Sequence, residues 1–385
     1  MNSDRTLRDV ADATVGFVGK MTPHYRDEGV VFLRSQDIRP HSIDISSALR
    51  VDPSFEEKIK KSRLRGGDVV VVRTGKPGTS AVVPPELEGA NCSDLVVIRP
   101  NGTVDSRWLS YYINAAAQGF VRERLVGAVQ QHFNVRSALE MPLPTLSHEE
   151  QRAQAEVLSA LDDKVSANLE AASKARELAV ALIGEVASSM RLGELASVVR
   201  KSVNPSSLGL NAVKHFSLPN YDSGSAATES PSGIKSAKNL LQEPVVLVSK
   251  LNPRIPRIWA VDRLPVEPAL ASTEFVALAP RKVGTGSLWA ALLEPRFTRS
   301  LLERTAGTTG SHQRVKPEQM LDVDVPDVRD LESETKDLLE SLCRKVNDVA
   351  DENLRLAATR DELLPLLMSG KITVKDAEKT VEEVV

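Results

Sequence analysis

The chain repeats itself once, and no other feature constrains its fold as strongly. The four valines at 69–72 return as Val-Val-Leu-Val at 245–248, and the apolar stretch 95–100 returns at 275–280. Offsets between matching motifs stay between 176 and 185 residues along the chain. Such a period is too long for a solenoid, whose repeats span about 20–50 residues. We therefore expect two tandem copies of a globular unit, each followed by a helix.

Further matches indicate which parts of the two copies correspond. Residues 7–11 match 192–196, and both copies end in a proline-bearing extended stretch, 141–144 and 323–326. Three residues shortly before these ends recur at an offset of 180, as the pairs Gly127 and Gly307, His132 and His312, and Val135 and Val315. The ends of the copies should therefore fold alike.

Within each copy the pattern is mostly that of β-strands. Short β-branched runs are bounded by Gly, Pro, Asn and Asp, and the two valine-rich runs read as buried strands. Apolar residues at helical spacing from Trp108 to Arg124 predict one helix across the first copy, and residues 287–304 are its counterpart.

Two acidic segments, 148–190 and 329–385, predict long helices because apolar residues recur every three or four positions. The seam consists of Leu158, Leu161, Val165, Asn168, Ala172, Ala175, Ala179, Leu182 and Val186 in the first segment and Leu339, Leu342, Val346, Val349, Asn353, Leu356, Arg360 and Leu363 in the second. Such heptads over about three to four repeats are typical of a coiled coil. The alternative is two unrelated surface helices, each packed on its own domain.

Local signals refine these two helices. Ser147-His148-Glu149-Glu150 resembles a capping box at the start of the first helix, and Pro365 should break or kink the second near its end. Asn168 and Asn353 lie on the seam, where asparagine usually fixes register at a cost in stability.

Composition limits the class of protein. The 385 residues, with 41% hydrophobic and 26% charged, suit two to three soluble globular domains. Two distant cysteines, Cys92 and Cys343, favour a reduced, cytoplasmic setting, and no apolar run is long enough to form a membrane span or signal segment. Aromatic residues, at 4%, are too scarce to make stacking on single-stranded nucleic acid the leading idea.

Charge is unevenly distributed behind the net value of −3. Residues 1–147 carry +2 and 191–328 carry +4, whereas 148–190 carry −4 and 329–385 carry −5. A mildly basic balance favours a polyanionic partner, although charge alone does not identify DNA.

The sequence contains no recognisable catalytic constellation. Residues 75–80 have the residue types of a phosphate-binding loop in the wrong order, and Gly284-Thr285-Gly286 lacks the third glycine of a dinucleotide fingerprint. The methyltransferase motif Asn-Pro-Pro-aromatic is absent, the cysteines lack metal-ligand spacing, and the six histidines are scattered. We expect no cofactor, no metal and no enzyme activity of the chain itself.

Polar loops occupy matching places in both copies instead. Arg suits guanine, Asn and Gln suit adenine, and neighbouring glycines let backbone amides approach phosphates. The candidate DNA contacts of the first copy are Arg34, Ser35, Gln36, Arg73, Thr74, Lys76, Gln130, Gln131, His132 and Asn134. Those of the second copy are Lys250, Asn252, Arg254, Ser311, His312 and Arg314. A solvated loop is the alternative reading for each residue taken singly.

Taken in order, these motifs resemble the specificity subunit of type I restriction-modification systems over essentially the whole chain. The motifs are Val31–Ile38, Gly67-Asp68 with the following valines and Arg73-Thr74-Gly75, Pro142–Pro144 followed by Glu150-Gln151 and the heptad helix, Leu247–Pro253, and Arg360–Pro365 with Ser369-Gly370. One departure is that Ser249-Lys250-Leu251 stands where the first copy has Arg-Thr-Gly, so the two copies should not read the same bases.

The resemblance implies an α+β fold with two mostly-β target-recognition domains, at 1–147 and 191–328. It further implies a central spacer helix at 148–190 and a C-terminal spacer helix and tail at 329–385. Each domain would read one half of a bipartite target on double-stranded DNA. Two tandem units that face one duplex are best related by a two-fold axis, which makes the helices an antiparallel coiled coil.

Under this reading the helices set the half-site spacing and dock methyltransferase (M) subunits, two of them if the symmetry holds. Restriction (R) subunits are a further candidate partner. Methylation, cleavage and ATP use would be carried out by these partner subunits. Three alternatives remain: a stand-alone DNA-binding relative without restriction partners, a degenerate DNA-modifying enzyme, and a purely structural spacer. The sequence does not reveal the target bases, the spacer length, the methylated adenines or which loop residues contact bases.

Overall fold

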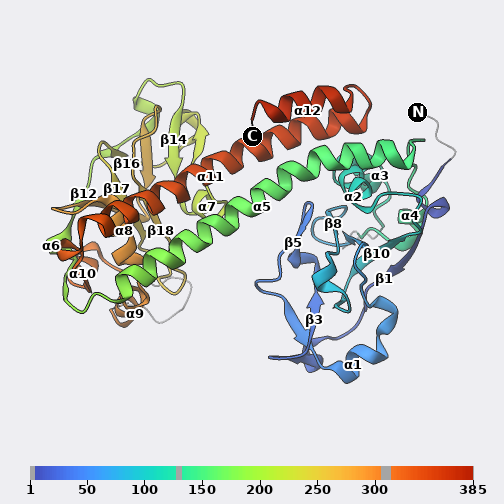
Figure 1. Cartoon of the computed structure of the whole chain (residues 1–385), viewed down its shortest axis with the longest axis horizontal. Helices are drawn as coiled ribbons and strands as arrows, with labels where there is room; N and C mark the ends of the chain where they lie inside the picture. Colours follow the sequence, from blue (N-terminus) through green and yellow to red (C-terminus); the bar gives the residue numbers. More distant parts are fainter. Residues whose placement is uncertain (1–4, 127–131, 305–313, 385) are drawn as a thin grey trace. The chain divides into compact units, whose positions relative to one another are not determined.

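A computed structural model describes residues 5–126, 132–304 and 314–384. The chain contains both helices and sheets and divides into two compact units, the first formed by Met1–Lys164 with Leu356–Val385 and the second by Val165–Arg355 (Figure 1). No described helix combines the length and apolar character that crossing a membrane requires.

The first unit is built on a four-stranded antiparallel sheet with the strand order β1-β10-β7-β8. These strands are β1 (Ala11–Val15), β7 (Val69–Val72), β8 (Ser80–Val82) and β10 (Leu95–Pro100). All four valines of β7 are buried, as predicted for this run. They pack on both faces of the sheet, because successive side chains of a strand point to opposite sides.

A second sheet in this unit has the order β2-β6-β3-β9, in which β3 and β9 are parallel. Its strands are β2 (Tyr25–Arg26), β3 (Val30–Leu33), β6 (Leu49–Val51) and β9 (Asn91–Cys92), beside the hairpin β4 (Ile38–Arg39) and β5 (Ser42–Ile43). Leu33, Ile38 and Cys92 pack against Val70, Val72 and other side chains of the first sheet in one apolar core.

The second unit repeats the first sheet strand for strand. Its sheet order β12-β20-β17-β18 matches β1-β10-β7-β8, and all its pairs are likewise antiparallel. The strands are β12 (Ala196–Val199), β17 (Val245–Ser249), β18 (Ile258–Val261) and β20 (Phe275–Pro280). The internal duplication expected from the sequence is therefore present in the fold.

A five-stranded sheet of order β13-β16-β19-β14-β15 accompanies it, with a parallel pair β14–β19 like β3–β9. The strands are β13 (Ser202–Val203), β14 (Val213–Phe216), β15 (Ala227–Glu229), β16 (Lys238–Leu241) and β19 (Ala269–Ser272), and β11 (Ser189–Arg191) pairs with β21 (Asp324–Pro326).

Strand register corrects the sequence alignment of the two copies. Val72 pairs with Leu95, and Ser249, not Val248, pairs with Phe275 in the corresponding place. The offset in this region is therefore 177, and the counterpart of Arg73 is Lys250. The prediction that Ser249 stands in the place of Arg73 was wrong by one residue, because matching valine to valine ignored the pairing strand.

A similar shift occurs near the end of each copy. Phe133 donates its backbone N–H to the Arg73 carbonyl, and Val315 donates to the Lys250 carbonyl in the same way. Val315 thus corresponds to Phe133 and not to Val135. By the same register the counterpart of His132 is Arg314, so the expected match of His132 with His312 was also wrong.

Each predicted crossing helix consists of two helices. The first copy has α2 (Ser106–Asn114) and α3 (Gln118–Glu123), separated where Ala115 leaves helical geometry, and Gln118 Nε2 donates to the Ile113 carbonyl there. The second copy has α8 (Thr285–Leu293) and α9 (Pro295–Glu303). Glu294 is extended because the residue before a proline disfavours helical geometry.

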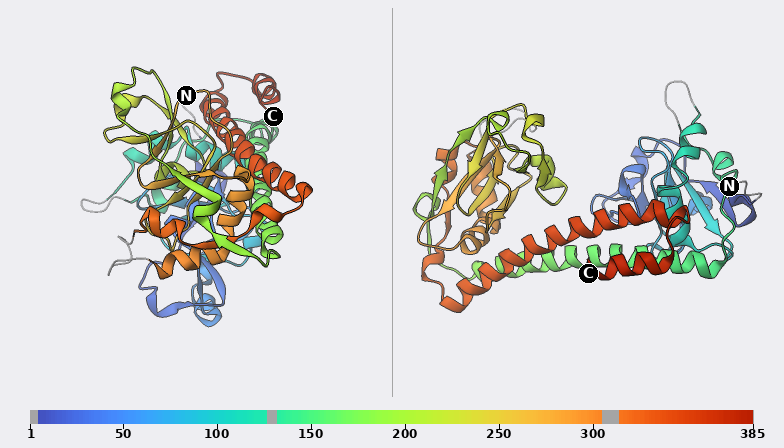
Figure 2. Two further views of the ribbon diagram at one scale, coloured as in Figure 1. Left: turned by 90° about the vertical axis from the view of Figure 1, so that its left-hand side faces the viewer. Right: turned by 90° about the horizontal axis from the view of Figure 1, so that it is seen from above.

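The two predicted long helices are present as α5 (His148–Gly184) and α11 (Ser333–Met368), each a continuous ribbon in Figure 2. The capping box exists, since Ser147 Oγ accepts from Glu150 N and Glu150 Oε2 accepts from Ser147 N. Helix α11 continues through Pro365 and ends three residues later at Met368, so of the predicted break or kink the helix shows no break at the proline. Val186, placed on the first seam, lies beyond the end of α5.

The remaining helices are short. They are α1 (Pro53–Lys58), α4 (Val135–Leu139), α6 (Leu192–Leu195), α7 (Leu218–Asp222), α10 (Pro317–Leu321) and α12 (Val374–Glu382), with 3-10 turns η1 (Leu7–Asp9), η2 (Thr22–His24), η3 (Ser35–Asp37), η4 (Lys60–Ser62), η5 (Pro85–Leu87), η6 (Pro205–Ser207), η7 (Pro231–Gly233) and η8 (Val328–Asp330). In the second unit, Leu339, Cys343 and Val346 of α11 join the core beneath β17, β18 and β20.

Candidate nucleic-acid interface

A polar groove of about 510 Å³ in the first unit brings together two of the loops singled out in the sequence. Five predicted contact residues line it: Arg34, Ser35, Gln36, Thr74 and Lys76. Its lining also includes Arg39, Thr79 and Asp94, which the sequence reasoning did not select. The groove thus joins a 3-10 turn after β3, the loop between β7 and β8, and the residues just before β10.

The turn after β3 is held by a buried carboxylate. Asp37 accepts hydrogen bonds from the backbone N–H of Arg34 at 2.8 Å and from its Nε and Nη2 at 3.1 and 3.0 Å. Arg34 Nη2 also donates to the Ser47 carbonyl. These contacts fix the Arg34 guanidinium at the groove wall, while Gln36 at the middle of the turn is exposed.

Two glycines shape the loop between β7 and β8. Gly75 and Gly78 have φ of +84° and +89°, which side chains other than glycine rarely adopt. A Cβ on Gly75 would meet none of the described residues within 4 Å, so glycine is needed there for backbone conformation and not for space. The adjacent Lys76 is exposed at the groove edge, where its ammonium can reach a phosphate.

Asp94 joins these two segments. Its Oδ1 accepts from Arg73 Nη1 at 3.0 Å, its Oδ2 accepts from Thr74 Oγ1 at 2.5 Å, and its carbonyl accepts from Ser35 Oγ at 3.5 Å. Arg73 Nε in turn donates to the Phe133 carbonyl at 3.1 Å. Arg73 is only 14% exposed, so its side chain organises the loop and does not extend from it.

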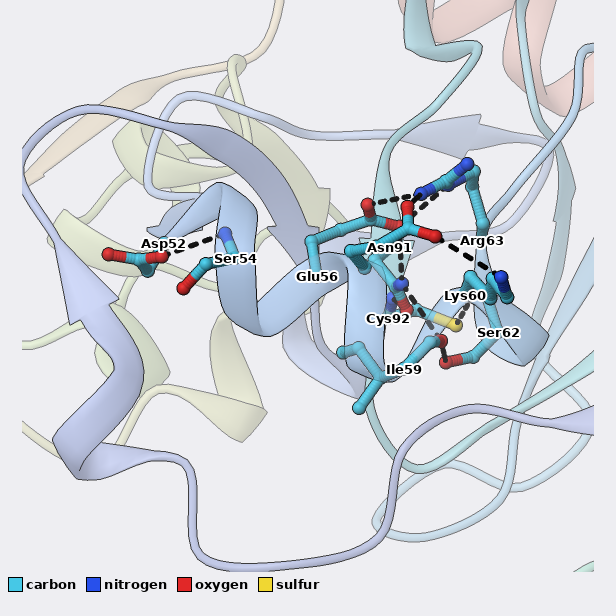
Figure 3. Close-up of polar contacts among 10 residues, drawn as sticks. Asp52, Ser54, Glu56, Ile59, Lys60, Ser62, Arg63, Asn91 and Cys92 are labelled. Carbon is cyan, nitrogen blue, oxygen red and sulfur yellow. Dashed lines mark hydrogen bonds and ion pairs between the residues drawn. The ribbon is translucent and has the colours of Figure 1, made fainter.

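A second polar network in this unit surrounds Glu56, as Figure 3 shows. The buried Glu56 of α1 accepts two hydrogen bonds from Arg63 and one from Asn91 Nδ2. The hydrogen bonds from Arg63 lower the pKa of Glu56, so this carboxylate stays charged. Asn91 begins β9, and the network therefore fixes the strand from which Asp94 follows three residues later.

The other predicted residues of the first unit lie outside the groove lining. Asn134 caps α4, since its Oδ1 accepts from Ser137 N at 2.8 Å, and the His132 backbone pairs with that of Val126. Gln130 and Gln131 lie outside the described residues.

In the second unit the corresponding loop begins at Lys250. Asn252 corresponds to Gly75 in the strand register, and like Gly75 it has a positive φ, of +49°. Its buried Oδ1 has no hydrogen-bond partner among the residues described. Arg254 is exposed. Arg314 donates from Nε and Nη2 to the Glu274 carboxylate at 3.3 and 3.1 Å. Ser311 and His312 lie outside the described residues.

Asp94 and Glu274 are the functional candidates that the sequence reasoning missed. Each immediately precedes the strand by which the two copies align at an offset of 180, so the repeat itself could have identified them. Carboxylates repel phosphates, so an acidic residue does not stand out in the sequence as a DNA contact.

The groove offers recognition chemistry. Guanidinium, ammonium, amide and hydroxyl groups surround it, and these groups read base edges or hold phosphates. Over the described ranges, no group of three or more His, Cys, Asp or Glu could hold a metal ion. Both thiols are buried, and burial raises the pKa of Cys92 to about 12 and also raises that of Cys343, which makes them poor nucleophiles.

These elements define a tandem-repeat α+β protein in which each sheet-based unit carries a polar loop cluster and is followed in sequence by a long helix. The fold is similar to that of the crystal structure of the type I restriction-modification system S subunit from M. genitalium. The two chains are 16% identical with a TM-score of 0.59, and the similarity covers 95% of this chain and 96% of that one. This chain therefore has the S-subunit fold, which confirms the resemblance drawn from the motifs.

Two other solved structures are similar over comparable lengths with lower TM-scores. The HsdS subunit from Thermoanaerobacter tengcongensis is 17% identical, with a TM-score of 0.30 and 95% of each chain covered. A structure of the type I R-M system, described for its complex assembly and conformational transition, is 18% identical, with a TM-score of 0.33 and coverage of 97% of this chain and 96% of that one. No protein-family profile matches the sequence, and no curated protein matches it either.

Proposed function

We propose that the chain is the DNA sequence-specificity subunit of a type I restriction-modification complex. The observation that carries this proposal is the S-subunit fold over 95% of the chain, together with a polar groove built from loops of the first unit. Domains at 1–147 and 191–328 each read one half of a bipartite target on double-stranded DNA. Their unequal loops, with Arg73-Thr74-Gly75 in one and Lys250-Leu251-Asn252 in the other, give the halves different sequences.

The proposed contacts are the loop residues that the sequence selected, with those lining the groove foremost. Lys76 and Arg39 suit phosphates because they are charged and exposed, and Gln36 suits a base edge because its amide is exposed in the middle of a fixed turn. Corresponding contacts in the second domain come from Lys250, Asn252, Arg254 and Arg314.

We further propose that the segments 148–190 and 329–385 pair as an antiparallel coiled coil that sets the distance between the half-sites. Three contacts support this pairing: Gln154 Nε2 donates to the Leu367 carbonyl, Arg360 Nη1 donates to Asp162 Oδ1, and Asn168 Nδ2 donates to Asn353 Oδ1. Along these three contacts the residue number rises on α5 and falls on α11. Two helices that run in opposite directions pair in this way.

The subunit itself performs no chemistry in this proposal. Methyl transfer comes from methyltransferase subunits, two of them if the complex is symmetric, and cleavage comes from restriction subunits where these are present. The acidic helices suit such protein partners better than a DNA backbone. The complex works in the cytoplasm, where the DNA is.

The decisive experiment is methylome sequencing of the host with and without this gene. Loss of one bipartite adenine-methylation motif, with two specified halves around a fixed gap, is the expected result and would reveal the target. If all motifs survive, binding of the purified chain to random duplexes separates a stand-alone DNA-binding protein from one with no DNA function. Methyl transfer by the chain alone, with S-adenosylmethionine and DNA, would identify an enzyme instead.

A further inference from the structure

Both units contain an ion pair at the same place in the fold. Asp94 directly precedes β10 and binds Arg73, and Glu274 directly precedes β20 and binds Arg314. In each unit the acid lies opposite the end of the neighbouring strand, since Leu95 pairs with Val72 and Phe275 pairs with Ser249. The acid is therefore a shared feature of the two units.

The arginine, in contrast, comes from different segments. Arg73 follows β7, whereas Arg314 directly precedes Val315, the residue whose N–H donates to the Lys250 carbonyl. By strand register, Arg314 takes the place of His132, and Lys250 takes the place of Arg73. In both units a backbone hydrogen bond joins the two segments that could supply the arginine. The first unit takes its arginine from the segment that accepts this hydrogen bond, and the second unit takes it from the segment that donates it.

The contact ties two polar loops to each other in both units. In the first, Arg73 bridges Asp94 and the Phe133 carbonyl, and Thr74 Oγ1 adds a hydrogen bond to the same carboxylate. In the second, Glu274 accepts from both Nε and Nη2 of Arg314, and its own carbonyl accepts from Lys250 N. The two units make the acid–arginine contact with different arginines. The contact between the loops, and not a particular arginine, is therefore what the units share.

Stability does not explain these acids well. The side chains of Asp94 and Glu274 are 40% and 32% exposed, and ion pairs so open to water contribute little to folding. Asp94 also has φ of +53°, a conformation that costs energy for residues other than glycine. A carboxylate beside a surface that binds DNA also lowers the affinity of that surface for phosphates. The remaining benefit is a fixed loop geometry.

We propose that Asp94 and Glu274 are positioning residues that hold the DNA-reading loops of their own domains and so set sequence selectivity without adding affinity. This inference rests on the proposed function. It assigns each acid to one half of the target: Asp94 to the half read by the first domain, and Glu274 to the half read by the second. Neither residue needs to touch a base.

The test selects duplexes from a random-sequence pool with the full-length chain and sequences the bound fraction. Asp94→Asn keeps the size of the side chain and tolerates positive φ, and Glu274→Gln keeps its shape, so both remove mainly the charge. We expect Asp94→Asn to lose roughly tenfold selectivity in one half of the selected sequence and Glu274→Gln to lose it in the other. Affinity for random duplex should stay equal or rise.

Two controls separate positioning from general damage. Glu140→Gln removes an acid that pairs with Arg124 and Arg136 outside the groove, at 37% exposure, and should leave both halves unchanged. Asp94→Glu keeps the carboxylate, so it should retain more selectivity than Asp94→Asn, and any cost of glutamate at the φ of +53° shows in its melting temperature. Melting temperatures of all variants show whether any loss follows unfolding.

Unchanged selectivity in Asp94→Asn and Glu274→Gln would overturn the inference. Equal loss in both halves, or loss in proportion to a lowered melting temperature, would also overturn it and leave a structural role only. A wild-type chain that selects no sequence from the pool would instead overturn the proposed function, and the inference with it.

Discussion

Whether a side chain can read DNA depends on what already holds it. Arg34 and Arg73 were selected from the sequence as free reaching groups, but the structure ties both guanidinium groups to carboxylates. Such fixed arginines present a defined face to a ligand, because little freedom is lost when they bind. Exposed Gln36 and Lys76 retain the reach that the sequence suggested.

Arg73→Ala should therefore weaken binding to one half-site only. The substitution removes both the ion pair with Asp94 and the hydrogen bond to Phe133, so we expect a cost of about 1–3 kcal/mol at cognate sequence and little change on random duplex. Binding titrations with duplexes altered in one half at a time measure this. Equal loss on unrelated sequences would mean that Arg73 contributes a phosphate contact or nothing specific.

His41 makes the first unit sensitive to acid. Burial lowers the pKa of His41 to about 4 from an ordinary 6.5, and the charges that face it are Asp162, Arg360 and Asp361. Its ring lies 4.5 Å from that of Tyr111, and its Nδ1 lies 3.2 Å from Asn114 Nδ2. Charging this ring inside the fold is unfavourable.

Between pH 6.5 and 4 the unfolded chain binds a proton at His41 that the folded chain does not, so stability falls as the pH falls through this window. The loss attributable to His41 between pH 7 and 5 should be at most about 2 kcal/mol. Urea unfolding of the wild type and His41→Asn at both pH values measures it, and asparagine suits the φ of +66°. Identical pH dependence in the two proteins would contradict this assignment.

At the scale of elements, the close approach of two helices explains a pair of glycines that resembles part of a dinucleotide-binding motif. Gly284-Thr285-Gly286 lies where α8 meets α11, and a Cβ on Gly286 would lie 2.6 Å from the Leu339 carbonyl oxygen. The Glu340 carboxylate accepts from Gly286 N and Ser287 N at 2.8 and 3.0 Å. Acidic side chains at a helix N-terminus are stabilising, so this pair of glycines allows α11 to cap α8.

Gly286→Ala should lower the free energy of unfolding by about 2 kcal/mol, since the added methyl group forces α8 away from the α11 backbone. Gly119→Ala is the matched control within a helix, because in the described part of the chain its Cβ would meet no atom within 4 Å. Alanine there should be neutral or add about 0.5–1 kcal/mol. Denaturant unfolding of both variants decides, and equal effects would exclude the steric explanation.

Asn168 and Asn353 were placed on one seam by the sequence, and the structure joins them by a hydrogen bond of 2.9 Å. We expect Asn168→Leu with Asn353→Leu to be more stable than the wild type by about 1 kcal/mol but to lose a unique helix register. Either single substitution should destabilise, because it leaves one amide without this partner. Selected duplexes should then show more than one gap length for the double variant, and a single sharp gap would show that the asparagines do not fix register.

The elements that the sequence predicted well are those with a strong apolar pattern. Buried strands at 69–72 and 245–248 and the long helices follow from runs of apolar residues, which need no tertiary information. The division of the crossing helix after Asn114 was not predictable, because three alanines lie there and the Gln118 side chain compensates the break. The break before Pro295 was predictable, since proline restricts the preceding residue.

On the scale of the whole molecule, the duplication was visible in the sequence, but its register was not. A shift of one or two residues changes which side chains correspond in the two copies. The strand pairing is what shows that Lys250 corresponds to Arg73. Asp94 was missed for a related reason. Its contacts come from two distant segments, the turn after β3 and the loop after β7, which a local pattern does not reveal.

Helix length should control the gap between half-sites. Inserting one heptad into each of α5 and α11 at facing positions lengthens both helices by about 10 Å, which corresponds to about 3 base pairs of duplex. The selected or methylated motif should keep both halves and gain about 3 unspecified base pairs between them. An unchanged gap would mean that the helices do not measure the distance, and altered halves would mean that the insertion disturbs the recognition domains.

The exchanged arginines also carry information about ancestry. If both units descend from one copied module, the acid kept its place while its arginine partner came to differ between the copies. A module with neither arginine would have left Asp94 or Glu274 without its cation, whereas a module with both would have kept a functional contact throughout. The less costly route between the two present forms therefore passes through a twin-arginine ancestor, and a chain rebuilt with His132→Arg should tolerate that state.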